Sequence, residues 1–75
     1  MEHKEIIEEK LNYFLNNSIK VHITKFNKEF LNGKIYSKLS NEIYLVREDR
    51  QGNIKVFLNE IFDIDEFKEK RENEK

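Results

Sequence analysis

The first eighteen residues carry apolar side chains on one face of a predicted helix. The residues with the i, i+4, i+7, i+8 spacing are Ile7, Leu11, Phe14 and Leu15. Glu, Lys and Asn fill most of the other positions, so the pattern predicts an amphipathic helix over residues 4–16. The run Asn16-Asn17-Ser18 predicts its end, because these side chains compete for backbone hydrogen bonds and tolerate conformations that stop a helix.

From residue 19 the hydrophobic period changes to two. Apolar and polar residues alternate over 19–24, which is typical of a strand with one buried face. The same signal predicts four further strands, at about 30–39, 43–46, 54–58 and 61–64. Gly33, inside the second strand, predicts a bend or a close backbone approach. Gly52, in the polar loop before the fourth strand, is the candidate for a positive φ.

One helix followed by five short strands indicates a mainly β, α+β domain over residues 1–67. A five-stranded sheet of this size buries a core only by curling, so we expect a strongly bent antiparallel barrel of Sm-like or SH3-like form over residues 19–67. Residues 68–75 are almost wholly charged, and we expect a disordered tail there.

Composition narrows the classes of protein. The 75 residues include no Cys and two His, so no disulfide or metal site is expected. No apolar run reaches the roughly 18 residues of a membrane span, and the start of the chain lacks the order of a signal peptide, which together predict a cytoplasmic protein. No nucleophile with a nearby base and no phosphate-binding glycine loop is present, so neither an enzyme nor a cofactor is expected.

The formal net charge of −1 divides unevenly along the chain. Residues 19–61 sum to +3, whereas residues 1–18 and 62–75 each sum to −2. A modest positive patch on a nearly neutral protein can bind a few phosphates. The alternative is that lysines scattered on strand faces keep a small sheet soluble.

The order and spacing of these segments resemble the Sm-like family, Hfq-type members included. The resemblance is carried by the helix at 6–15 and by four later runs, at 19–26, 31–35, 41–45 and 57–61. It implies a small barrel that binds single-stranded RNA as a homo-oligomeric ring of six or seven subunits. The chain departs from the family pattern at Leu39, where an acid is common, and at Leu58-Asn59 or Asn59-Glu60, where a basic dipeptide is common. A uridine pocket of the family type is therefore not implied.

To bind RNA, each subunit of such an assembly needs an aromatic side chain that stacks on a base, amide groups that bond base edges, and cations that contact phosphates. We expect Asn41 and Asn59, on two short turns, to supply amide hydrogen bonds, and Tyr36 and Tyr44 to stack on bases. The expected phosphate contacts are Lys20, Lys25, Lys34 and Lys38. Plain turn chemistry is the alternative explanation of the two asparagines, and it is the commoner one, just as tyrosines on strands more often cover a sheet or an interface.

The resemblance also implies how subunits would join, because Sm-like proteins pair the fourth strand of one subunit with the fifth of the next. The corresponding interface residues here are Ile54, Val56, Phe57, Leu58, Ile61, Phe62 and Ile64. The alternative places Phe57 and Phe62 in the core under the helix. The alternative function is a protein-interaction module that uses a small barrel and its edge strands without binding nucleic acid.

Overall fold

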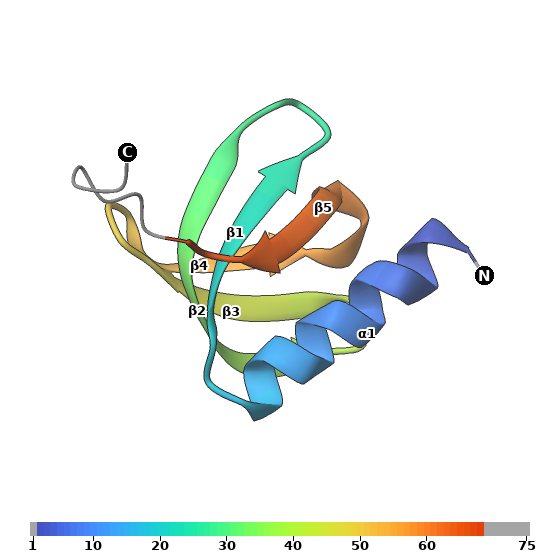
Figure 1. Ribbon diagram of the computed structural model, residues 1–75, viewed down its shortest axis with the longest axis horizontal. Helices are drawn as coiled ribbons and strands as arrows, with labels where there is room; N and C mark the ends of the chain where they lie inside the picture. The colour runs from blue at the N-terminus through green and yellow to red at the C-terminus, as the bar shows by residue number, and fades with distance from the viewer. Residues whose placement is uncertain (1, 69–75) are drawn as a thin grey trace.

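The computed structural model describes residues 2–68 and consists of one helix and one antiparallel sheet (Figure 1). Its elements in chain order are α1 (His3–Asn16), β1 (Lys20–Lys25), β2 (Phe30–Ser40), β3 (Ile43–Glu48), β4 (Gly52–Phe57), the 3-10 helix η1 (Leu58–Glu60) and β5 (Ile61–Glu66). The predicted class, mainly β with an N-terminal helix and five antiparallel strands, is confirmed. The expected tail lies, apart from Lys68, outside the described residues.

The strands follow the order β4-β3-β2-β1-β5, so β4 and β5 form the two edges. They do not pair with each other, and the expected barrel is therefore not closed. The long strand β2 curves across the molecule in Figure 1. Gly33 permits a close approach within this curve, since a Cβ there would overlap the carbonyl oxygen of Arg47 on β3. The predicted close backbone approach at Gly33 is confirmed.

Helix α1 packs its apolar face onto one side of the sheet (Figure 1). Its buried residues are Ile7, Leu11 and Phe14, three of the four that the helical spacing indicates. The strands and η1 complete this core with Val21, Ile23, Leu31, Ile35, Tyr44, Val46, Val56, Leu58, Ile61 and Ile64. The opposite side of the sheet, which we call the outer face, is left to solvent. Within residues 2–68 no helix is long and apolar enough to cross a membrane.

Local features explain two element bounds, the end of α1 and the start of β4. The side-chain amide of Asn17 donates to the carbonyl of Tyr13 at 2.8 Å, and Ser18 adopts a φ of 54°, which turns the chain out of α1. Gly52 has a φ of 78° at the start of β4, as predicted. Both predicted breaks therefore follow from side chains or backbones suited to them.

The third strand buries Tyr44, which is expected from the sequence to stack on bases. Ile43 and Leu45 are only partly buried, whereas Tyr44 is fully buried. Its ring lies under α1, where its hydroxyl donates to the side-chain oxygen of Asn12 at 3.2 Å and so is not left unpaired. The expected outward orientation of Tyr44 is wrong, because the partly apolar alternation of this strand fits either face. Burial also raises the pKa of the Tyr44 hydroxyl.

Candidate nucleic-acid interface on the outer face

A group of polar and positive side chains gathers on the outer face of β2, β3 and β4. Register defines it: Arg47 lies opposite both Lys34 and Asn53, and Lys55 lies opposite Leu45, two residues before Arg47. Cross-strand partners and alternate residues of one strand point to the same side of a sheet. We call this group the basic face, and it comprises Lys34, Tyr36, Arg47, Asn53 and Lys55, all of them exposed.

Tyr36 reaches this face because the sheet is irregular beside it. The register of β2 against β3 shifts between Ile35 and Ser37, so Tyr36 is an extra residue on β2. Tyr36 is 53% exposed. Because of this bulge, Tyr36 has no residue directly opposite it on β3, as it would have in a regular ladder.

Arg47 stacks on Tyr36 and is fixed by two further contacts. Its guanidinium carbon lies 4.9 Å from the centroid of the tyrosine ring. One guanidinium nitrogen donates to the Tyr36 hydroxyl at 3.2 Å, and Nε donates to the side-chain oxygen of Asn53 at 3.4 Å. The three side chains come from three neighbouring strands, so the arrangement depends on the fold of the sheet.

Within residues 2–68, the cations of the basic face have no carboxylate partner. Among the residues that the structure describes, Lys34, Arg47 and Lys55 form no ion pair within 4.0 Å. Their charge is therefore available to an anionic ligand. Sequence reasoning found Lys34 and Tyr36 but missed Arg47, Asn53 and Lys55. The predicted strands 43–46 and 54–58 leave Arg47 and Asn53 outside the sheet. In the structure β3 and β4 are longer, and these two residues pair with each other.

The other predicted lysines are engaged with acids. Lys20 lies 2.7 Å from the Asp49 carboxylate and also covers the ring of Phe67. Lys38 lies 3.7 Å from Glu8 of α1. Each of these two cations is balanced by a neighbour, which makes it a weaker candidate for a phosphate than Lys34.

Lys25 is the most strongly paired of the predicted phosphate contacts. Its ammonium lies 2.9 Å from Glu60 and 3.3 Å from Glu29, and its side chain is 19% exposed. Glu60, followed by Glu29, raises the pKa of Lys25 against the opposing effect of burial. The lysine joins β1 to η1 and serves the local structure.

The predicted amide donors lie on turns that meet. Asn41 and Asn59 are both exposed, and the backbone N–H of Leu58 donates to the carbonyl of Glu42 at 2.8 Å, which joins the turn after β2 to η1. The pairing of Ile43 with Phe57 continues this junction into the sheet. The two asparagines therefore lie beyond the Ile43–Phe57 pair, at the opposite end of β3 from Arg47.

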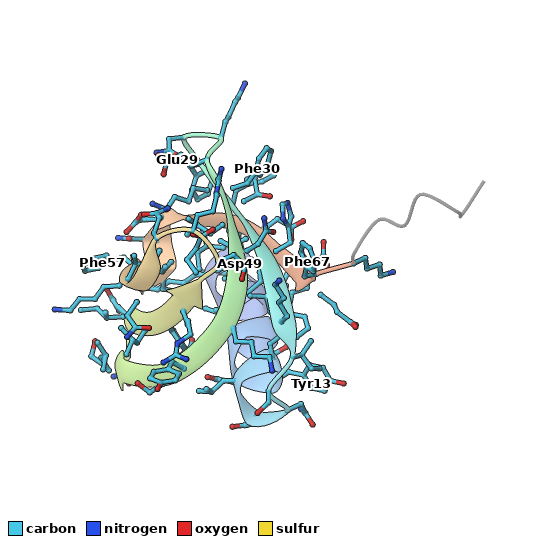
Figure 2. All side chains as sticks on the ribbon, turned by 90° about the vertical axis from the view of Figure 1, so that its left-hand side faces the viewer. Tyr13, Glu29, Phe30, Asp49, Phe57 and Phe67 are labelled. Atoms are coloured by element: carbon cyan, nitrogen blue, oxygen red, sulfur yellow. The ribbon has the colours of Figure 1, made fainter. Side chains whose placement is uncertain are left out.

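The predicted interface residues divide into two groups. Val56, Leu58, Ile61 and Ile64 are buried in the chain's own core, so only their backbones could meet another subunit. Phe57 and Phe62 are 42% and 52% exposed, and Ile54 is partly exposed. Figure 2 shows Phe57 beside the β4 edge, on the opposite side of the view from Phe67. The interpretation of these two phenylalanines as core is wrong.

The outer face of β1 and β5 has a different character. The His22 ring stacks on Phe30 with centroids 5.2 Å apart, and its Nδ1 donates to the side-chain oxygen of Asn32 at 2.6 Å. A hollow of about 820 Å³ beside them is lined by Phe14, His22, Asn32, Asp65, Glu66, Phe67 and Lys68. Its two carboxylates disfavour a phosphate, so the hollow does not extend the basic face.

A buried carboxylate fixes the hairpin that carries Arg47 and Asn53. Glu48 is 3% exposed and accepts N–H bonds from Asn32 at 3.2 Å and from Arg50 and Gln51 at 2.8 Å each. Burial favours the protonated form, but the three N–H bonds outweigh it, so the pKa of Glu48 lies below its usual range. The charged carboxylate therefore holds the turn between β3 and β4 against β2.

No family model matches the sequence, and no curated protein is similar to it. In the described part of the chain, no three His, Asp or Glu side chains gather in a way that could hold a metal ion. The basic face is accordingly interpreted from its own geometry and charge.

Proposed function

We propose that this chain is a single-stranded RNA-binding protein of the Sm-like type. The observation that carries the proposal is the stack of Arg47 on the exposed Tyr36, flanked by the unpaired cations Lys34 and Lys55. Cations attract and position phosphates, and an aromatic ring next to them offers a surface on which an unpaired base stacks. The basic face combines both requirements in one patch.

The arrangement favours a single strand over a duplex. A base can stack on the half-exposed Tyr36 ring only where it is not already stacked within a helix. Arg47 is held by Tyr36 and Asn53 before any ligand binds, so little side-chain entropy is lost on binding. Asn41 and Asn59, beyond the Ile43–Phe57 pair, would donate or accept at base edges.

We further propose that the protein acts as a homo-oligomeric ring of six or seven subunits, each a bent Sm-like barrel. The position of β4 and β5 at the two edges of the sheet supports it, since head-to-tail pairing of these edges would generate a closed ring. Repetition would multiply a weak site, because linked copies bind one RNA with a raised effective concentration.

The experiment compares two tyrosines of similar exposure. Tyr36 is 53% exposed on the basic face, and Tyr13 is 57% exposed on α1 and lies far from Phe57 in Figure 2. We expect Tyr36→Leu to weaken binding of short oligo-U or oligo-A about tenfold, the scale of one lost stacking contact, as measured by fluorescence anisotropy at low salt. Tyr13→Leu should leave the affinity within about twofold. Equal losses from both variants would contradict the assignment of the basic face.

A protein-interaction module is the second candidate, and the exposed aromatic residues favour it. Phe62 on β5 packs against Phe26 at 5.5 Å and His3 at 6.0 Å, which forms an aromatic cluster next to an edge strand. If neither RNA binds the wild-type protein at low salt, where phosphate contacts are strongest, this candidate replaces RNA binding.

A further inference from the structure

The outward edge of β5 is covered by side chains of the same subunit. In an antiparallel sheet, alternate residues of an edge strand direct their N–H and C=O groups away from the neighbouring strand. The N–H of Ile64 donates to Oδ1 of Asp63 at 2.9 Å. Its carbonyl accepts from Nζ of Lys10 at 3.3 Å. Ile64 is therefore an edge-facing residue, and both of its pairing groups are occupied.

Ion pairs hold this covering in position. The Lys10 ammonium, on α1, lies 3.5 Å from the Asp63 carboxylate and 3.6 Å from that of Asp65. At the start of the same strand, Nε2 of His3 donates to the carbonyl of Ile61 at 3.3 Å. Helix α1 thus contacts the backbone of β5 at two points, its first residue, Ile61, and its fourth, Ile64.

The β4 edge has no comparable covering. The N–H of Phe57, its last residue, donates to Glu60 at 3.2 Å. No side chain of the described residues forms a hydrogen bond to the backbone of residues 52–56. The two edges of one sheet therefore differ in their readiness to accept another strand.

We infer that Lys10 and Asp63 form an edge cap, which keeps β5 closed and so limits self-association of the chain. The occupant of the opened edge is β4 of a second copy. Charge supports this choice, because β5 carries Asp63, Asp65 and Glu66 while β4 carries Lys55 and no acid. This inference rests on the self-association in the proposed function and adds its control: β4 joins β5 only when the edge cap releases Ile64.

Opening the β5 edge to a second subunit exchanges existing hydrogen bonds for new ones. An incoming strand would bond the N–H and C=O of Ile64, but it must first displace Asp63 and Lys10 from them. The gain from each new bond is offset by the loss of an existing one, so the edge cap weakens association without abolishing it. Removing the cap should strengthen association by about the worth of one such bond.

The test measures molar mass by light scattering over a series of concentrations, without RNA. Lys10→Met keeps the length of the side chain and removes its donor. We expect its self-association at a concentration about fivefold lower than that of the wild type, the factor that one hydrogen bond supplies. The matched control is Lys4→Met, which removes the same charge from α1 but pairs with Glu42 at 3.2 Å, away from β5.

A second measurement follows the edge itself. Asp63→Ala should accelerate hydrogen exchange at the Ile64 amide of the monomer, because that N–H loses its acceptor. The inference is overturned if Ile64 exchanges equally fast in both proteins, if Lys10→Met associates no better than Lys4→Met, or if every protein stays monomeric. RNA binding is measured on the same samples and tests the proposed function separately. If the proteins bind RNA but all stay monomeric, RNA binding is retained and the edge cap is overturned.

Discussion

β4 and β5 are both edge strands of one sheet, but the charged side chains around them are used in opposite ways. Near β4, the cations of the basic face have no carboxylate partner in the described chain. Near β5, Lys10 contacts Asp63 and Asp65, and side chains bond the backbone of Ile64. Cations and backbone hydrogen-bonding groups are therefore available near β4, whereas near β5 they already have partners.

The difference shows that a lysine's role depends on the acids that the fold places beside it. Exposed ion pairs contribute about 0.2 to 1 kcal/mol each to stability, and their partners reduce the field that an anion experiences. An unpaired cation contributes little to stability and keeps its field for a ligand. The sheet therefore separates a side suited to binding from a side suited to holding α1.

The largest effect is expected where β2 and β3 approach each other beneath the basic face. Gly33→Ala places a methyl group onto the carbonyl oxygen of Arg47, and this clash is with paired strand backbone, which cannot rotate away as a side chain can. We expect the free energy of unfolding to fall by about 3 kcal/mol or more, or the protein not to fold, as measured by urea denaturation.

Gly52→Ala is the control for this substitution. A Cβ at Gly52 meets no atom within 4 Å, but its φ of 78° is unfavourable for alanine. We expect a loss of about 1 kcal/mol from backbone strain alone. A loss at Gly33 no larger than the loss at Gly52 would show that the β2–β3 approach is not sterically constrained.

The next largest effect concerns the carboxylate that fixes the β3–β4 hairpin. Glu48→Gln removes the charge that accepts three backbone N–H bonds, so the free energy of unfolding should fall by about 1 to 3 kcal/mol at pH 7. The folded pKa of Glu48 is lowered. Its contribution is therefore present above the unfolded pKa of about 4.3 and is lost as the pH falls through the folded pKa.

The variant should consequently lose less stability than the wild type when the protein is acidified from pH 7 to below pH 4.3. Glu9→Gln, on the exposed side of α1, provides the control, since Glu9 forms no ion pair or side-chain hydrogen bond within residues 2–68. Identical acid profiles for wild type and Glu48→Gln, by thermal melts across pH, would assign the acid response to other groups.

The sequence predicted the elements well and the faces of the strands less well. The spacing of Ile7 and Leu11 and the positive φ of Gly52 are local properties, and each prediction from them is confirmed. The close approach at Gly33 is a contact between strands, but the glycine inside a strand pattern marks it in the sequence, and that prediction is also confirmed. Tyr44 was assigned to the wrong face because apolar residues stand on both sides of its strand. A pattern of period two cannot choose a face when both alternates are apolar.

The candidate site was predictable only in part, for a related reason. Lys34 and Tyr36 were found from composition and spacing, but the availability of Lys34 follows from which residues lie opposite it. The bulge that frees Tyr36 and the ion pair that engages Lys20 are properties of register. Register is set by the whole sheet, and a single sequence gives it poorly.

The smallest predicted effect compares two lysines that face each other across the boundary between the two regions. Lys20 on β1 lies opposite Lys34 on β2, but only Lys20 has an acid partner, Asp49 at 2.7 Å. We expect Lys34→Ala to weaken RNA binding about fivefold and to reduce the slope of log affinity against log salt by about one. Lys20→Ala should change the affinity by less than about twofold.

Both variants remove one positive charge from adjacent positions, so any long-range effect on the approach of RNA is the same in each. The difference between them reports direct phosphate contact. Equal losses with equal salt slopes would mean that pairing with Asp49 does not restrain Lys20 and that only total charge matters. A loss confined to Lys34→Ala would place the boundary of the RNA site between β1 and β2, where the unpaired cations give way to paired ones.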